Sequence, residues 1–224
     1  FASLSPTVQI PLITALKQRA DMTARTTILQ AVDSENESVQ ITALEALAVL
    51  GTKEDVLLLA ENATSRTEAV SDAAMFALSR LNADDVDAQI LEVIPEAEVR
   101  VKEKLVEAVG ERKIDDSTGL LVDLAKNDDN RRVQVAATKS LARVASPDDL
   151  DTLIDILVSA GGTAERREAE RTVITVAMKM QDAGERSAKI KAALETATDP
   201  DAKASLLQVA GNIGDPQMLP VLQN

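Results

Sequence analysis

The segment Val39–Gly51, with the sequence VQITALEALAVLG, decides the fold. Its apolar residues at positions 1, 5, 8, 9 and 12 fall on one stripe of an α-helix. The same pattern starts again near residues 8, 70, 101, 133, 169 and 202. Because the first four starts are 31 residues apart, the pattern predicts an array of stacked repeats.

Each unit carries a second apolar segment about twenty residues after its first position. The central residues of these segments are Ile28, Leu59, Ile90, Leu121, Leu153, Ile190 and Leu222. Each unit is therefore expected to be a pair of helices. One pair cannot bury its own apolar stripe, whereas stacking neighbouring pairs gives a continuous core.

The repeat resembles the HEAT repeat, in the short form found in bilin-lyase-type proteins. The segment from Glu37 to Gly51 carries the Val, Ala, Ala-Leu and Gly of that motif. The resemblance implies an all-α fold, a right-handed α-α superhelix (solenoid) of about seven HEAT-like helical hairpins. The motif's Arg is replaced, for example by Gln40 and Gln134. Glutamine hydrogen bonds or plain packing are expected where the family commonly has an Arg–Asp ladder.

We expect residues 1–224 to form a single repeat array. The chain starts at Phe1 rather than Met, which suggests a segment of a longer protein. The start near residue 169 follows the start near 133 by 36 residues, and the extra residues are expected in a loop around Ser159–Arg167. Such an insertion is either a functional loop or a tolerated linker.

Several residues predict where helices begin and end. Thr52 and Ser146 are expected to cap helix N-termini, and Gly51, Asn82 and Gly214 to end helices in the left-handed conformation. Adjacent carboxylates could in principle perform acid–base catalysis. Their positions at predicted helix starts instead favour capping for Asp84, Asp85, Asp87, Asp115, Asp116, Asp128, Asp129, Asp148, Asp149 and Asp151.

Composition argues against several classes of function. The chain has no Cys and no His, and its only aromatic residues are two Phe. We therefore expect no catalytic, metal or cofactor site. A net charge of −13 and the scarcity of rings argue against nucleic-acid binding. No run of eighteen apolar residues is present, so no membrane insertion is expected, and the compartment stays open.

The candidate interaction surface is the concave face, which the first helix of each repeat should line. Positions 3, 4, 7 and 11 are expected to point into it, and Ala136 and Thr172 belong to this set. The candidate partner-binding residues are Phe76, Arg80, Lys104, Lys139, Arg143, Arg171 and Lys179. The simpler interpretations are that Phe76 fills a gap between helices and that the cations form an ordinary solvated face.

These observations favour a non-catalytic scaffold that binds another protein through its concave face. Two alternatives remain. One is an accessory domain, chaperone-like or lyase-like, of an enzyme or larger polypeptide, and the other is a structural spacer. The fold alone does not choose between them, since one architecture serves many functions. The oligomeric state stays open.

Overall fold

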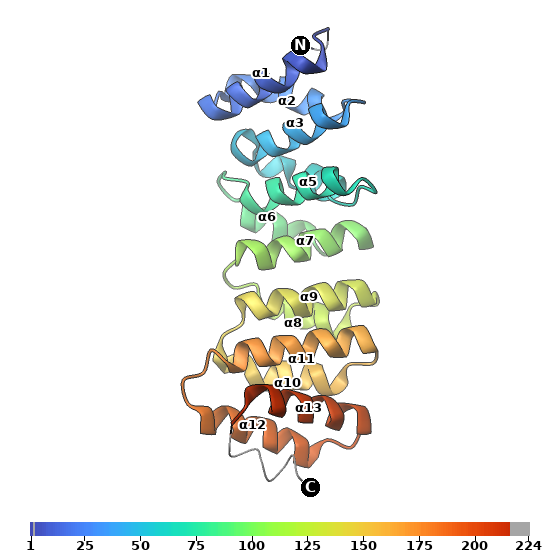
Figure 1. Cartoon of the computed structure of the whole chain (residues 1–224), viewed down its shortest axis with the longest axis vertical. Helices are drawn as coiled ribbons and strands as arrows, with labels where there is room; N and C mark the ends of the chain where they lie inside the picture. Colours follow the sequence, from blue (N-terminus) through green and yellow to red (C-terminus); the bar gives the residue numbers. More distant parts are fainter. Residues whose placement is uncertain (2, 216–224) are drawn as a thin grey trace. The chain divides into compact units, whose positions relative to one another are not determined.

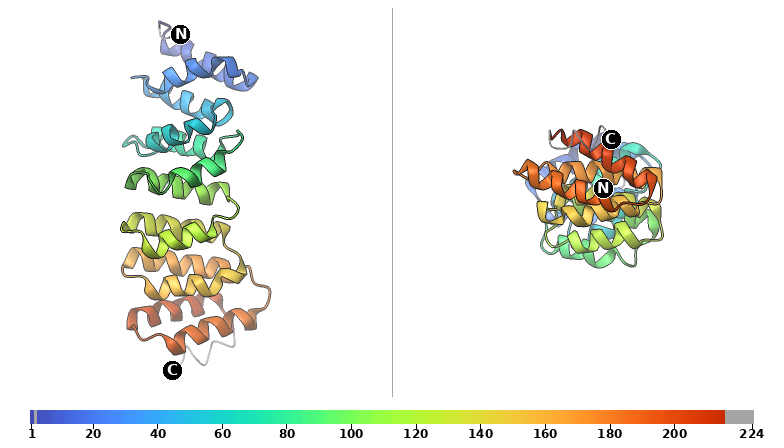
Figure 2. Two further views of the ribbon diagram at one scale, coloured as in Figure 1. Left: turned by 180° about the vertical axis from the view of Figure 1, so that it is seen from behind. Right: turned by 90° about the horizontal axis from the view of Figure 1, so that it is seen from below.

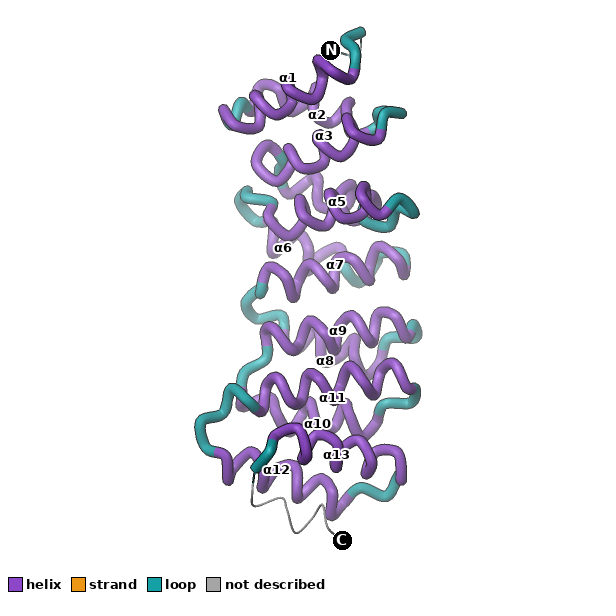
Figure 3. The backbone as a smooth tube through the Cα atoms, viewed as in Figure 1, coloured by secondary structure: helices purple, strands orange, loops and turns teal. Residues whose placement is uncertain are grey.

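The structure is a computed structural model that describes residues 1 and 3–215. Within these residues it contains helices and loops and no strand, which confirms the all-α prediction (Figure 3). The chain divides into an N-terminal unit, Phe1–Arg112, and a C-terminal unit, Lys113–Asn224. Each unit is a stack of helical hairpins of the α-α solenoid class. Whether the two form one array stays a prediction.

The N-terminal unit has two layers of helices (Figure 1). The first-helix layer contains α1 (Pro6–Arg19), α3 (Glu37–Leu50), α5 (Glu68–Arg80) and α7 (Val99–Arg112). The second layer contains α2 (Arg25–Val32), α4 (Val56–Asn62) and α6 (Val86–Val93). Neighbours within the first layer contact each other in the order α1, α3, α5, α7. The side of this first layer that faces away from the second layer is called the first-helix face below.

The C-terminal unit repeats the two-layer arrangement, which Figure 2 shows from behind. Its first-helix layer contains α9 (Arg131–Val144), α11 (Thr163–Ala177) and α13 (Pro200–Ile213). Its second layer contains α8 (Thr118–Asn127), α10 (Leu150–Ser159) and α12 (Ala183–Thr196). Helix α11 lies between α9 and α13 and contacts both.

The core lies between the two layers of each unit, where the sequence pattern places it. The predicted second-helix residues within the described chain are buried, namely Ile28, Leu59, Ile90, Leu121, Leu153 and Ile190. First-helix residues such as Leu47 and Leu141 are fully buried as well. Burying a large aliphatic side chain stabilises a fold by about 1.5–3 kcal/mol. The predicted seventh member, Leu222, lies outside the described residues.

The first repeat departs from the predicted stripe. Val8 was expected in the core, but it is 47% exposed. Gln9 and Ile13 are buried in α1 instead. The buried face of α1 is thus turned by one residue relative to the later helices. Helix α1 packs against α3, and the periodicity alone did not fix which side of α1 this contact would cover.

The sixth repeat keeps the predicted register but begins differently. Ala169, Val173, Val176 and Ala177 of α11 are buried, as Val133, Ala137, Ser140 and Leu141 of α9 are, 36 residues earlier. Helix α9 begins two residues before Val133, whereas α11 begins at Thr163, six residues before Ala169. The extra residues therefore lie around Ser159–Arg167 as predicted, but they form an added turn of α11 rather than a longer loop.

The predicted helix starts are confirmed at two places. Thr52 and Ser146 each form a capping box with the carboxylate three residues later, Asp55 and Asp149. Two other predicted capping residues behave differently. Asp85 and Asp116 have φ angles of 59° and 58°, so these residues make left-handed turns rather than the predicted side-chain caps.

Of the three predicted left-handed helix ends, only Gly214 is confirmed, with φ of 67°. Asn82 is not among the described positive-φ residues. Gly51 has an extended backbone with φ of −80°. Close packing requires a glycine at this position, because an added Cβ would lie 2.5 Å from the Leu47 carbonyl oxygen and 2.7 Å from Leu81 Cδ1.

Glutamine hydrogen bonds replace the Arg of the motif, as predicted. The Gln134 side chain donates to the Asp128 carbonyl at 2.7 Å, and the Gln40 side chain donates to Asn62 Oδ1 at 3.4 Å. However, ion pairs between repeats do exist, formed by residues outside the motif position. They join Lys17–Glu45, Arg25–Asp55, Lys53–Asp85, Arg112–Asp87, Lys126–Asp155, Arg131–Glu165, Arg166–Asp199 and Lys189–Asp151.

Candidate interaction surface

The seven predicted partner-binding residues are divided between the units. Phe76, Arg80 and Lys104 belong to the N-terminal unit. Lys139, Arg143, Arg171 and Lys179 belong to the C-terminal unit. All except the half-buried Lys104 are exposed. The structure therefore gathers the candidates into two separate sets, and each is described by itself.

Phe76 is an exposed ring on the first-helix face of the N-terminal unit. It is 40% exposed, so the interpretation that it fills a gap in the core is wrong. The Arg80 guanidinium carbon lies 4.6 Å from the ring centroid, one helical turn further along α5. The Lys17 ammonium lies 5.9 Å from the same centroid. A cation within about 6 Å of a ring face is attracted by the negative potential of that face.

The site also includes Lys17, which the sequence did not point to, and Glu45, which the repeat pattern placed on the concave face. Lys17, at the end of α1, forms an ion pair of 3.7 Å with Glu45 of α3. Lys17 thereby links α1 to both α3 and α5. We define the Phe76 cluster as Lys17, Glu45, Phe76 and Arg80. The position of Glu45 on the predicted concave face was a usable signal. Lys17 gave none, because its long side chain reaches across a neighbouring helix.

Lys104 is engaged within its own helix. Its ammonium lies 2.8 Å from the Glu107 carboxylate, and both side chains are only about one quarter exposed. In the C-terminal unit, Arg171 is 3.7 Å from Glu168. Arg171 itself is exposed, and exposed pairs contribute roughly 0–1 kcal/mol, so this cation can exchange partners at little cost.

Lys179 has a structural task in the C-terminal unit. Its ammonium donates hydrogen bonds to the carbonyl oxygens of Ala142 and Ala145 at 3.2 and 2.8 Å, at the C-terminal end of α9. These carbonyls lack partners within their own helix, and a cation there also complements the helix dipole. Lys179 thus caps the helix of the neighbouring repeat, although its side chain is exposed like those of Lys139, Arg143 and Arg171.

Two other residues predicted on the concave face are buried. Ala136 and Thr172 lie inside the C-terminal unit, and Thr172 has no exposed surface. The Thr172 hydroxyl donates to the Thr138 carbonyl of α9 at 2.9 Å. This bond satisfies the Thr172 hydroxyl, so the polar side chain can be buried at a position that the pattern had placed on the open concave face.

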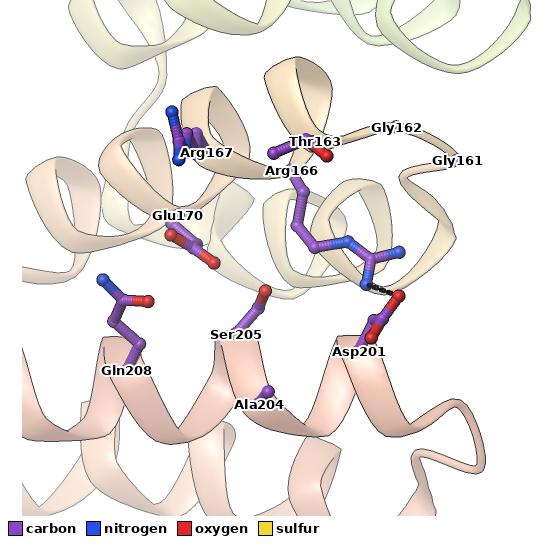
Figure 4. A pocket seen from close by; sticks show the side chains of 10 residues that line it. All are labelled: Gly161, Gly162, Thr163, Arg166, Arg167, Glu170, Asp201, Ala204, Ser205 and Gln208. Carbon is purple, nitrogen blue, oxygen red and sulfur yellow. Dashed lines mark ion pairs between the residues drawn. The ribbon is translucent and has the colours of Figure 1, made fainter.

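The loop around Gly161 borders a polar pocket of about 500 Å³ between the start of α11 and α13 (Figure 4). Arg166 spans this pocket and pairs with Asp199 at 3.4 Å and Asp201 at 3.8 Å. Its guanidinium also donates to the Ala160 carbonyl at 2.5 Å. Because Arg166 is already neutralised by two carboxylates, we assign it to holding α11 and α13 together.

Two exposed carboxylates away from these sets have lowered pKa values. The Thr23 hydroxyl and backbone N–H donate to Asp21 and lower the pKa of its carboxyl. A hydrogen bond from the Thr52 side chain is the main cause that lowers the pKa of Glu54. Both residues stand at helix starts, where the charged form of a carboxylate is favoured.

Across residues 1 and 3–215, no group of three or more His, Cys, Asp or Glu side chains is arranged to hold a metal ion. In the same part of the chain, no helix is both long and apolar enough to cross a membrane.

A family model of HEAT repeats matches residues 1–79 and 88–174 of this chain. Among solved structures, the chain is similar to the complex of CpcE and CpcF of phycocyanin lyase from a Nostoc species. That likeness has 16% identity and a TM-score of 0.41, and covers 94% of this chain and 91% of the other. YibA of Escherichia coli is similar at 17% identity and a TM-score of 0.46, over 99% of this chain and 90% of YibA. No curated protein matches.

Proposed function

Since the chain belongs to the HEAT-repeat family, we propose that it is a non-catalytic scaffold that binds another protein through its first-helix face. HEAT repeats typically mediate protein interactions. Stacked helical hairpins present extended surfaces that suit this task. The proposal takes residues 1–224 as one repeat array.

The observation that carries the proposal is the exposure of Phe76 beside Arg80. Aromatic and Arg side chains are enriched among the residues that dominate protein interfaces. A stacked ring and guanidinium lose little conformational freedom on binding, so their contacts are not offset by a large ordering cost. The exposed cations Lys139, Arg143 and Arg171 form the corresponding set of the C-terminal unit.

A photo-crosslinking experiment tests the proposal. Benzoylphenylalanine is placed at position 76 in one variant and at position 57 in another, and both are irradiated in cells that produce the protein. Leu57 is the matched control, because it is an apolar residue 44% exposed on α4, in the second layer.

We expect a discrete crosslinked protein from position 76 and none from position 57. An Arg80→Glu substitution in the position-76 variant should remove that crosslink. Identical crosslinks from both positions, or crosslinks from position 57 alone, would contradict binding through the first-helix face.

A further inference from the structure

We propose that the Arg80–Phe76 pair is a receptor for one carboxylate flanked by an apolar side chain in a partner segment. This inference rests on the proposed protein-binding function and specifies the chemistry of the partner. Arg80 would bind the carboxylate, and the exposed part of the Phe76 ring would contact the neighbouring apolar group.

The first argument is the state of the Arg80 guanidinium. It lies against the Phe76 ring at 4.6 Å. Within residues 1 and 3–215, no hydrogen bond or ion pair of the protein engages it. Stacking on a ring leaves the planar edge of a guanidinium open, with its N–H donors in a geometry that matches a carboxylate.

The second argument is the contrast with two other arginines of the same unit. Arg25 pairs with Asp55 at 2.6 Å and also donates to the Thr52 hydroxyl. Arg112 pairs with Asp87 and donates to two helix carbonyls. Both guanidinium groups hold repeats together and have acceptors already. Arg80, in contrast, is stacked on a ring and has no protein acceptor within the described residues.

The third argument concerns the surrounding charge. Within the cluster, Glu45 offsets Lys17, so Arg80 provides the remaining positive charge. The segment from Asp33 to Glu111 has 18 acidic and 6 basic side chains. Such an excess repels a run of acidic residues while one local cation still attracts a single carboxylate. The expected partner segment therefore carries an isolated Glu or Asp between aliphatic residues.

The near absence of rings supplies a direct test. Phe76 and Phe1 are the only aromatic residues, so labelling with 4-fluorophenylalanine gives one ¹⁹F signal from each. The probes are the peptides acetyl-Leu-Glu-Leu-amide, its uncharged Gln analogue and its Lys analogue. We expect the Glu peptide to shift the Phe76 signal in a saturable way, with Phe1 unchanged. Its apparent Kd should be roughly tenfold lower than that of the Gln peptide.

Arg80→Lys keeps the charge but removes the planar donor edge, and should weaken binding of the Glu peptide roughly tenfold. Arg66→Lys, at an exposed loop position of the same unit, should leave it unchanged. Far-UV circular dichroism verifies that both variants fold. Equal binding of the Glu and Gln peptides, an Arg80→Lys variant that binds as well as the parent, or no shift with any peptide overturns the inference.

The two proposals can fail separately. Crosslinks from position 76 without discrimination among the peptides would overturn the carboxylate receptor and leave protein binding intact. Crosslinks confined to position 57, together with selective peptide binding at Phe76, would support the receptor chemistry and contradict the proposed binding face.

Discussion

The two units use the same helical hairpin but fill their interiors differently. The described buried polar or charged residues of the N-terminal unit are Gln9 and Asp55. Those of the C-terminal unit are Ser117, Thr138, Ser140, Glu165, Thr172, Ser187, Ser205 and Asp215. Two of these hydroxyls donate to carbonyls of helix α9: Thr172 of the neighbouring helix donates to Thr138, and Thr138 donates to Gln134 one turn earlier. A repeat stack therefore tolerates small polar residues where a helix carbonyl offers an acceptor.

If the N-terminal unit depends on dry aliphatic packing, a charge at its centre should have the largest effect. Leu47→Asp places a carboxylate at a fully buried site, and should lower the free energy of unfolding by about 4 kcal/mol or more. Urea unfolding followed by circular dichroism measures the change.

Val49→Asp is the control for that substitution. Val49 lies on the same helix but is 40% exposed. It should cost less than about 1 kcal/mol. Equal losses for the two variants would show that the assigned buried face of α3 is wrong.

The next comparison concerns a device that both units share, a cation that caps a helix of a neighbouring repeat. Arg112 donates to the carbonyls of Leu78 and Leu81 at 3.2 and 3.1 Å, and its side chain is only 14% exposed. Arg112→Ala should destabilise the N-terminal unit by about 2 kcal/mol, because it leaves partly buried carbonyls and Asp87 without a partner.

Lys179→Ala should cost the C-terminal unit less, about 0.5–1 kcal/mol, because water can replace an exposed ammonium. Thermal unfolding of both variants beside the parent gives the order. A larger loss of stability for Lys179→Ala than for Arg112→Ala would contradict the expectation that the less exposed cation contributes more.

A smaller effect is expected from the buried hydroxyl of the C-terminal unit. Thr172→Val keeps the shape and removes one donor, and the Thr138 carbonyl still lies within helix α9. The free energy of unfolding should change by less than about 1 kcal/mol. A loss of the size expected for Leu47→Asp would mean that hydroxyl bonds, rather than packing, hold this unit.

The smallest effect concerns the pKa of Asp21. Its lowered pKa means that the charged form is favoured in the folded state. The associated stability is present above the ordinary carboxyl pKa and is lost as the pH falls through the lowered value. Thr23→Val removes the hydroxyl donor, so the Asp21 pKa should rise toward its ordinary value. A carboxyl ¹³C titration by NMR measures it, and an unchanged pKa would contradict the assigned cause.

Hydrophobic periodicity predicted the helix pairs and the buried residues that recur in every repeat, such as Leu47 and Ile28. The prediction failed in the two repeats that differ from the others, the first and the sixth. Val8 is exposed because α1 buries Gln9 and Ile13 instead. In the sixth repeat the pattern placed the extra residues in a loop, whereas they form an added turn at the start of α11 that contains the buried Glu165.

The candidate surface was predictable only in part. Phe76 and Arg80 share one helix, so their spacing of four residues already placed them side by side. Lys17 and the capping role of Lys179 depend on which repeats become neighbours and on how far a long side chain reaches. Such contacts follow from the tertiary structure and leave no periodic signal in the sequence.

The ion pairs between repeats have a consequence for how such a chain can evolve. Arg25 pairs with Asp55 between the first two repeats, whereas Lys53 pairs with Asp85 between the next two, so successive junctions use different positions of the repeat. A duplicated or transposed hairpin would bring its charges to a junction that lacks the matching partner. The repeats of the N-terminal unit thus share an apolar stripe but differ in the charges that join them, and exchanging two hairpins would lose these ion pairs.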